Sequence, residues 1–322
     1  MNLQGRATQF LVAGVVFAGI GVTLRYWDAL QAQPSLKKLP TSVKPTPKND
    51  SAASPKLVTG KGDPVLVGAG DIAKCDATED TLTAQILEEI PGTIFTMGDN
   101  VYQRGTAEEF QKCYDPAWGS LKARTFPSPG NHDYYTPNAA PYYAYFGTKA
   151  GPAGKGYYSY DLGQWHIVSL NSNIDAYKGS EQERWLRADL AAHPKTCTLA
   201  YWHHPVFSSG VHGNDPKMKD IWQTLSDMKA DVVVNGHDHH YERFAPQTAE
   251  GKADQKGLRQ FVVGTGGAEL RDRMTPKPNS EVRNAQTFGV IKFTLRPKTY
   301  DWEFVPIKGQ TFKDKGTGNC TT

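Results

Sequence analysis

Five short polar clusters, each placed just after an apolar run or a turn, constrain this chain more than any other feature of its sequence. In an open α/β sheet, ligands bind outside the carboxyl ends of the strands, so such clusters can converge on one crevice. One glycine–aspartate pair alone is typical of a turn, whereas five ordered clusters favour a common site. The clusters are Gly70-Asp71, Gly98-Asp99-Asn100-Val101-Tyr102, Gly130-Asn131-His132-Asp133, His203-His204-Pro205 with His212 nearby, and Gly236-His237-Asp238-His239.

The side chains in these clusters suit a pair of metal ions. Asp, Asn, Tyr and His supply oxygen and imidazole ligands, and no cysteine is among them, which argues against a thiolate structural site. The carboxylate of Asp99 has two oxygens and can bridge two cations. If the segment from His237 to His239 is extended, both imidazoles point to the same side. Two neighbouring cations can clamp both oxygens of an in-line displacement at phosphorus.

The apolar runs alternate with helical patterns and end in antiparallel pairs. This order predicts an α/β fold, a layered sandwich with mixed β-sheets. The patterns predict strands over 65–69, 93–97, 198–202, 232–235 and 261–263, helices over 78–90 and 180–192, and hairpins over 157–170 and 288–305.

In their order, the motifs GD, GDxxY, GNHD, HxP and GHDH resemble those of the calcineurin-like metallophosphoesterase superfamily, over residues 65–305. Two positions resemble the purple acid phosphatases within it. Asp71-Ile72-Ala73 lacks the histidine of the usual Asp-x-His motif, and Tyr102 occupies the tyrosinate position of GDxxY. Ala73 replaces the glycine of that family, so we expect a shifted first loop with its ligand retained. The resemblance implies a four-layer α/β/β/α sandwich, of the bacterial type without a plant-type N-terminal domain.

The resemblance also implies a role for each residue. The first metal would bind Asp71, Asp99, Tyr102 and His239. The second metal would bind Asp99, Asn131, His203 and His237. Fe(III) is implied at the Tyr102 site, with Fe(II), Zn or Mn at the second. A hydroxide held by the cations would attack phosphorus, while His132 and His212 would steady the phosphoryl oxygens and protonate the leaving alkoxide.

These patterns favour an exported phosphatase acting on small phosphate monoesters. A phosphodiesterase or nucleotide hydrolase on the same metal centre is an alternative, and a catalytically inactive metal-binding surface protein is a third. The formal net charge is only +3, from 36 basic and 33 acidic residues, so no nucleic-acid partner is expected. The sequence indicates no oligomer interface. An aromatic loop could line the substrate mouth or cover the core; it contains Tyr134, Tyr135, Tyr142, Tyr143 and Tyr145.

The amino-terminal part favours export. Residues 10–24 are an apolar run preceded by Arg6, so 1–32 is interpreted as a signal peptide or N-terminal membrane anchor. Residues 33–62 read as a Pro-rich flexible tether and 63–322 as the catalytic domain. Four cysteines suit two disulfides in a periplasmic, cell-surface or extracellular protein. Of the three connectivities open to them, our hypothesis is Cys75 with Cys113 and Cys197 with Cys320.

Overall fold

The computed structural model describes residues 62–152, 154–195 and 197–321. The predicted leader over 1–32, with its apolar run at 10–24, lies outside the described residues, as does nearly all of the predicted tether over 33–62. Within the described ranges, every helix is too short or too polar to span a bilayer.

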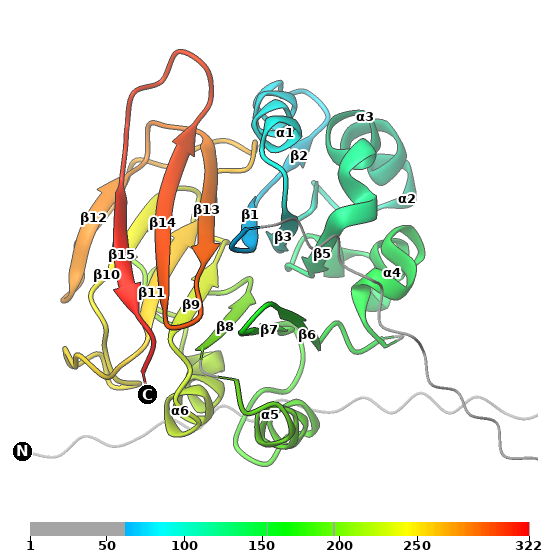
Figure 1. The fold of residues 1–322 in the computed structure, drawn as a ribbon. Coiled ribbons are helices and arrows are strands. Elements are labelled where there is room, and N and C mark those ends of the chain that lie inside the picture. Colours follow the sequence, from blue (N-terminus) through cyan, green and yellow to red (C-terminus); the bar gives the residue numbers. More distant parts are fainter. Residues whose placement is uncertain (1–61, 153, 196, 322) are drawn as a thin grey trace, which may run out of the picture. The chain divides into compact units, whose positions relative to one another are not determined.

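The described part contains two β-sheets that pack face to face (Figure 1). The first sheet has six strands in the order β15 (Lys315–Asn319), β14 (Thr299–Pro306), β13 (Gly289–Leu295), β1 (Val65–Ala69), β3 (Thr93–Met97) and β5 (Thr125–Ser128). The second sheet has seven strands in the order β12 (Ser280–Asn284), β10 (Tyr241–Phe244), β11 (Arg259–Val263), β9 (Val232–Asn235), β8 (Cys197–Trp202), β7 (Trp165–Ser169) and β6 (Tyr158–Leu162).

Both sheets are mixed. Strand β1 pairs in parallel with β3 and antiparallel with β13. Strand β9 lies parallel to β8 and β11, whereas β10 is antiparallel to β11. A separate parallel pair joins β2 (Ala73–Lys74) to β4 (Val101–Tyr102). The parallel strands β1, β3 and β5 form one side of the first sheet, and β11, β9, β8 and β7 form the middle of the second.

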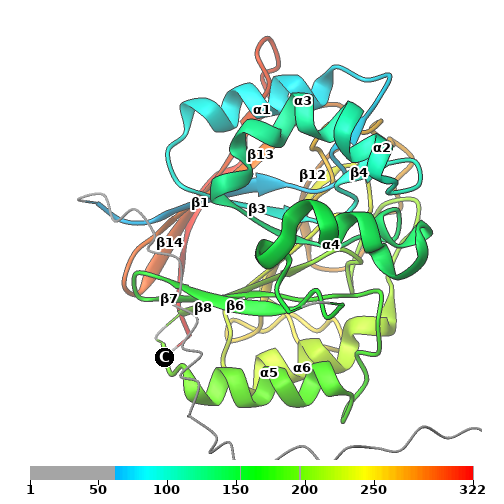
Figure 2. The same ribbon diagram turned by 90° about the vertical axis from the view of Figure 1, so that its right-hand side faces the viewer.

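Helices cover the outer faces of the two sheets (Figure 2). Helices α1 (Glu79–Glu89) and α3 (Asp115–Trp118) lie over the first sheet, and α5 (Glu181–Ala192) and α6 (Lys219–Asp227) lie over the second. Helices α2 (Ala107–Glu109) and α4 (Ala140–Phe146) are found toward β5. The predicted α/β/β/α sandwich with two mixed sheets is therefore confirmed.

The apolar runs build two cores. In β8, Leu199 and Tyr201 point into the core between the sheets, while Ala200 and Trp202 face the core under α5 and α6. Every residue of β8 is buried, which explains why the run reads as continuously apolar rather than alternating. Across the seam between the sheets, Phe95 packs against Tyr201 with ring centroids 5.3 Å apart.

Two local predictions need correction. In the predicted helix over 78–90, the helical spacing puts Leu82, Ile86, Leu87 and Ile90 on one side. Of these four only Leu87 is fully buried, together with Thr83 and Ala84. A hydrogen bond fixes this face of α1 inward, because Thr83 Oγ1 donates to the carbonyl of Gly266 at 2.6 Å.

Residues 107–124, for which the patterns above predict no helix, are helical in short pieces. Helix α2 runs into a π-turn at Phe110–Tyr114, then α3, then a 3₁₀ turn at Gly119–Arg124. Helix α6 was likewise not predicted. Further 3₁₀ turns span Asp133–Tyr135, Pro137–Ala139, Gly147–Ala150 and Pro216–Met218. Pieces this short carry too few repeats of the helical period to stand out in sequence.

The hypothesis for the disulfides is confirmed. Cys75 bonds Cys113, with Cα atoms 4.7 Å apart, and Cys197 bonds Cys320, with Cα atoms 5.4 Å apart. The second bond ties the C-terminal end of the chain to the start of β8. Each bond closes a loop, and loop closure restricts the unfolded chain.

Candidate metal centre

All five polar clusters lie at one end of the sandwich. They follow β1, β3 and β5 in the first sheet and β8 and β9 in the second. The amide of Gly236 donates to the carbonyl of His203, which holds the last two clusters together. Asp71, Asp99 and His237 each have a positive φ, of 60°, 47° and 71°. Left-handed backbone at three non-glycine residues is unfavourable and concentrates at functional sites.

One group of side chains surrounds the phenol of Tyr102. Its oxygen lies 2.8 Å from Asp71 Oδ1, 3.1 Å from Asp99 Oδ2 and 3.1 Å from His239 Nε2. His239 Nε2 is also 3.3 Å from Asp71 Oδ1. The four side chains implied for the first metal thus converge on one point.

A second group surrounds the imidazole of His203. Its Nε2 lies 3.1 Å from Asn131 Oδ1, 3.2 Å from Asp99 Oδ2 and 3.2 Å from His237 Nδ1. These are the four side chains implied for the second metal. Because Asp99 Oδ2 belongs to both groups, its carboxylate is placed between them.

Backbone carbonyls orient two of the histidines. His203 Nδ1 lies 2.7 Å from the carbonyl of Met97, and His239 Nδ1 lies 2.5 Å from the carbonyl of Glu269. A ring N–H that donates to a carbonyl leaves the other nitrogen free to bind a cation. In both rings that other nitrogen, Nε2, is the one that points into the centre.

The charges of the centre are buried and incompletely balanced. Asp71 and Asp99 are 0% and 1% exposed, and among the described residues neither contacts a lysine or an arginine. Burial opposes ionisation of Asp99, but the adjacent His203 outweighs it and holds the pKa of that carboxyl well below its usual range. Burial opposes protonation of His203, yet Asp99 raises its pKa to about 9.

Tyr102 is protonated in the chain without a cation. Burial, and then the charges of Asp71 and Asp99, raise the pKa of Tyr102 well above its ordinary value. The phenol accordingly donates a hydrogen bond to Asp71. The donor set as a whole fits cations better than protons, because buried carboxylates require positive charge and these lack a basic side chain.

His132 is held beside the centre rather than inside it. Its amide donates to Asp99 Oδ1 at 2.8 Å, and its Nδ1 lies 2.6 Å from the carbonyl of Gln103. The ring packs between Tyr102 and Tyr135, with centroids 4.3 and 4.6 Å away. Tyr135 is 53% exposed whereas Tyr142 is fully buried, so the aromatic loop both rims the site and covers the core.

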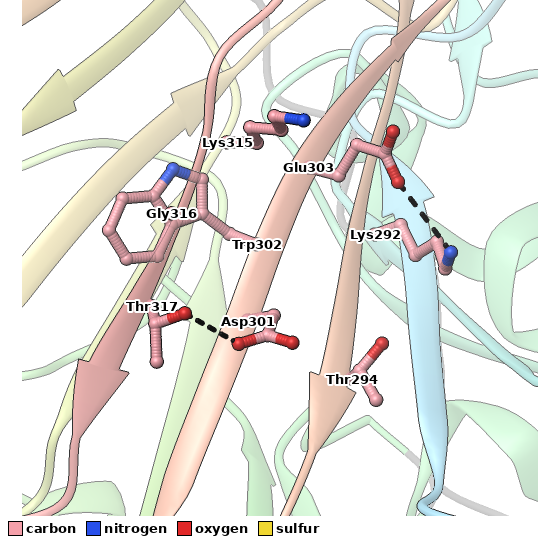
Figure 3. Close-up of a pocket in the computed structure, with 8 residues that line it drawn as sticks. All are labelled: Lys292, Thr294, Asp301, Trp302, Glu303, Lys315, Gly316 and Thr317. Atoms are coloured by element: carbon pink, nitrogen blue, oxygen red, sulfur yellow. Dashed lines mark hydrogen bonds and ion pairs between the residues drawn. The ribbon is translucent and has the colours of Figure 1, made fainter.

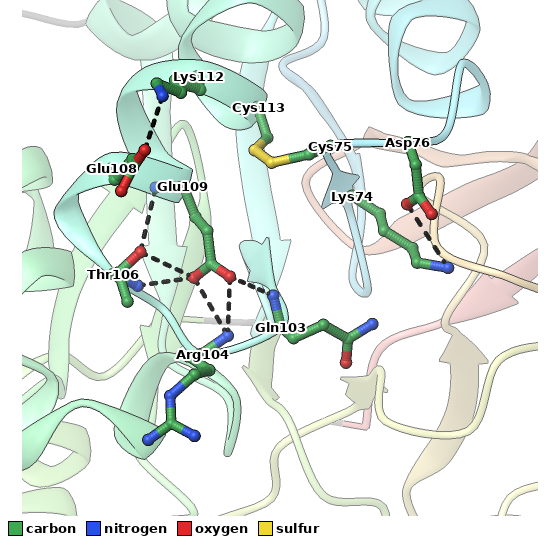
Figure 4. The surroundings of a disulfide bond; sticks show 10 residues. All are labelled: Lys74, Cys75, Asp76, Gln103, Arg104, Thr106, Glu108, Glu109, Lys112 and Cys113. Atoms are coloured by element: carbon green, nitrogen blue, oxygen red, sulfur yellow. Dashed lines mark hydrogen bonds and ion pairs between the residues drawn. A yellow bond between two sulfur atoms is a disulfide. The ribbon is translucent and has the colours of Figure 1, made fainter.

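The loop that carries Gln103 is fixed by Glu109 and by a disulfide (Figure 4). The Glu109 carboxylate accepts from the amides of Gln103 at 2.6 Å and of Thr106 at 2.9 Å, and also from the amide of Arg104. The Cys75–Cys113 bond joins this helical segment to the end of β2, which pairs with Tyr102 in β4. The positions of Tyr102 and His132 therefore depend on a framework outside the motifs.

His212 lies beside the second group of side chains, next to His237. Its ring is 4.3 Å from that of His237, and its amide donates to Asp238 Oδ1 at 3.0 Å. Burial, and after it the nearby Arg271, lower the pKa of His212 against the opposing charge of Asp238. Arg271 Nη1 donates to His212 Nε2 at 2.7 Å. No motif marks Arg271, and the sequence analysis missed it.

One geometric expectation is wrong. The segment from His237 to His239 is a bend, not an extended strand, because β9 ends at Asn235 and His237 has a positive φ. The two imidazoles consequently serve different groups. His204, next to the predicted ligand His203, packs on the ring of His237 with centroids 4.4 Å apart, and its Nδ1 lies 2.7 Å from Ser172 Oγ.

The comparison with known families agrees with this geometry. The model of the calcineurin-like phosphoesterase family matches residues 65–241, more than half of the chain, and the protein belongs to that family. Membership implies a dinuclear metal centre. Within the family the chain fits the purple acid phosphatase-like group, so both parts of the sequence-based recognition are confirmed.

The similar proteins include plant enzymes. The chain is 28% identical to purple acid phosphatase 15 of Arabidopsis thaliana over 67% of its own length and 46% of that protein. It is 34% identical to purple acid phosphatase 22 of the same plant, over 41% of the chain and 32% of the relative. The chain thus spans less than half the length of these relatives.

Solved structures share the fold at low identity. Purple acid phosphatase PPD1 from yellow lupin (Lupinus luteus) seeds matches with a TM-score of 0.65 and 20% identity, over 80% of this chain and 53% of that one. GAP50, the anchor in the inner membrane complex of Plasmodium, matches with a TM-score of 0.62 and 14% identity, over 81% of this chain and 90% of that one. Because proteins with such different descriptions share the fold, the function must be argued from the site.

Proposed function

We propose that the protein is a phosphatase that hydrolyses small phosphate monoesters at a two-metal centre. The observation that carries the proposal is the sharing of the Asp99 carboxylate between two complete ligand groups. When bound, the two cations would supply Lewis-acid activation of water and of the phosphoryl group.

The residues of the chain would bind the cations, bind the phosphoryl group and donate the proton. Asp71, Asp99, Tyr102 and His239 would hold one cation, and Asn131, His203 and His237 would complete the other side with Asp99. His132, oriented by the carbonyl of Gln103, would donate a proton to the leaving oxygen. His212, which packs on His237, would bind a phosphoryl oxygen.

The donor chemistry supports different metals on the two sides. Tyr102 would bind as a phenolate only after its proton is displaced, which favours a trivalent cation such as Fe(III). The second side, with two imidazoles, an amide oxygen and a carboxylate, suits Fe(II), Zn or Mn. A visible charge-transfer band that disappears in Tyr102→Phe, with metal content retained, is the expected result. A colourless, active, zinc- or manganese-only enzyme would overturn the iron assignment.

Two test substrates distinguish the alternative reactions. The full chain should turn over p-nitrophenyl phosphate much faster than bis(p-nitrophenyl) phosphate. Faster turnover of the diester would move the assignment to a phosphodiesterase or nucleotide hydrolase. Metal binding without hydrolysis of either ester would favour an inactive metal-binding surface protein.

We also propose export, with 1–32 as the leader or anchor, 33–62 as the tether and 63–322 as the catalytic domain. The proposal rests on the apolar run at 10–24 and on the pairing of all four cysteines. Fractionation of expressing cells, with N-terminal sequencing of the product, tests it. A protein found wholly in the cytoplasm with free thiols would contradict it.

A further inference from the structure

Arg271 has an unusual set of contacts for a charged side chain at the rim of the centre. Its Nη1 donates to the imidazole of His212, 2.7 Å away, instead of to a carboxylate. The carboxylate nearest to it among the described residues is Glu269, at 3.5 Å from Nη2. Glu269 is 50% exposed and also lies 3.6 Å from Lys74, so its charge is divided and screened.

The backbone places this guanidinium beside the proposed ligands. The amide of Arg271 donates to the carbonyl of His239 at 3.0 Å, which ties the two loops together. The ring of His212, which Arg271 contacts, packs 4.3 Å from the ring of His237. With 31% of its side chain exposed, Arg271 is held in position yet remains open to a ligand from solvent.

We propose that Arg271 binds the phosphoryl group of the substrate through the oxygen that only a monoester carries, and so sets the preference for monoesters. The proposal deepens the proposed function and rests on it. A monoester has three non-bridging oxygens and, above a pKa of about 6, two negative charges. A diester has two such oxygens and one charge. Guanidinium offers several N–H donors in a plane, which matches phosphate.

His212 has a second role in this arrangement. By accepting from Arg271 it holds the guanidinium toward the centre, so His212 and Arg271 form one oxygen-binding unit. Beside Tyr102, the rim carries His132 and the exposed ring of Tyr135 instead, with no basic side chain in contact with His132 among the residues described. The charged rim therefore faces the phosphoryl group and the aromatic rim faces the leaving group.

The test compares Arg271→Gln with Arg273→Gln in the full chain. Arg273 lies two positions further on, is exposed, and has no hydrogen bond or ion pair to the described residues, so it is a matched control. For each variant, metal content, kcat and KM are measured on p-nitrophenyl phosphate and on its bis ester. The dissociation constant of inorganic phosphate is measured by calorimetry.

Loss of one charge-assisted contact corresponds to about a tenfold effect. In Arg271→Gln we expect kcat/KM on the monoester to fall and the dissociation constant of phosphate to rise by about that factor, with the diester rate within about twofold. Arg273→Gln should change none of these. Equal losses on both esters, or unchanged phosphate binding, would overturn the proposal.

Two further outcomes remain decisive. If Arg271→Gln loses metal, Arg271→Lys takes its place, because lysine keeps the charge without the planar donors. Phosphate binding as tight in that variant as in the wild type would then reject the role of the guanidinium. If the wild-type chain hydrolyses neither ester, the proposed function fails, while phosphate binding by the variants still decides the role of Arg271.

Discussion

Two regions of the sandwich carry similar charged residues but differ in how those charges are paired. In the metal centre, Asp71 and Asp99 are buried and contact histidines without a lysine or arginine among the described residues. On the outer face of β13–β15, a cavity of about 510 Å³ opens to solvent (Figure 3). There Glu303 lies 3.6 Å from Lys292, and Asp301 accepts from Thr317 at 2.7 Å and from Arg296.

The pairing of the charges decides which of the two polar regions can bind a cation. The carboxylates of the outer cavity are already neutralised and partly exposed, so they offer a ligand little. The carboxylates of the centre share buried space with one another and gain most from an added cation. The presence of a cavity on the outer face therefore does not make that face a ligand site.

The largest contrast is expected between Asp99→Ala and Asp301→Ala. Removing the shared carboxylate should release metal from both sides and lower kcat/KM by about a thousandfold or more. Asp301→Ala should leave metal content and activity unchanged. Metal analysis and kinetics on the two purified variants check the pair, and an active, metal-loaded Asp99→Ala protein would refute the assignment of the centre.

A smaller loss is expected at the rim, from His132→Asn. Removing a proton donor should lower kcat by about a hundredfold, with metal content retained. The loss should be greater on an alkyl phosphate than on p-nitrophenyl phosphate, because nitrophenolate leaves readily without a proton. His193→Asn, at an exposed histidine at the end of α5, is the control. Equal losses on both substrates would argue against a proton donor at this position.

The centre could be predicted from the sequence because its residues lie in ordered motifs directly after buried strands. The groups that orient those residues could not be predicted. The carbonyls of Met97, Gln103 and Glu269 orient three histidines, and backbone carbonyls carry no residue signature. Arg271 reaches His212 from 59 residues away, through the contact of two loops. The bend at His237 was not predicted either. Its positive φ interrupts the extended backbone, in which alternate side chains would point to the same side.

A third cluster, around His166, combines features of both regions. His166 has the residue types of the centre around it but is fully paired, with Asp161 and Asp189 each 2.8 Å from a ring nitrogen. His193 stacks on its ring, Lys195 lies 3.3 Å from Asp161, and Ser159 donates to Asp189. Burial disfavours the charged ring, but the two carboxylates outweigh it and raise the pKa of His166.

His166→Gln should therefore cost stability and not activity. Loss of hydrogen bonds to charged partners is worth about 2 kcal/mol of unfolding free energy. Because the folded pKa is raised, this contribution is complete below the unfolded pKa of about 6.5 and is lost as the pH rises through the folded value. Urea unfolding at pH 6 and pH 9 should show the variant approaching the wild type at the higher pH. A difference that grows with pH would contradict the pairing.

The smallest effect is expected at the outer cavity itself. Lys292→Gln breaks a pair whose partner Glu303 is 54% exposed, and such pairs contribute less than about 1 kcal/mol. Thermal unfolding should shift slightly, and less at high salt, with hydrolysis and phosphate binding unchanged. A measurable loss of activity would show that this face is coupled to the centre, which would contradict the proposed difference between the two regions.

The origin of the ligands in both sheets has a consequence for motion. Asp71, Asp99, Tyr102 and Asn131 follow strands of the first sheet, and His203, His237 and His239 follow strands of the second. Each bound cation would consequently bridge the two layers at one end of their seam. Chelation should let that end open and exchange its amide hydrogens, while the opposite end, closed by Cys197–Cys320, stays protected.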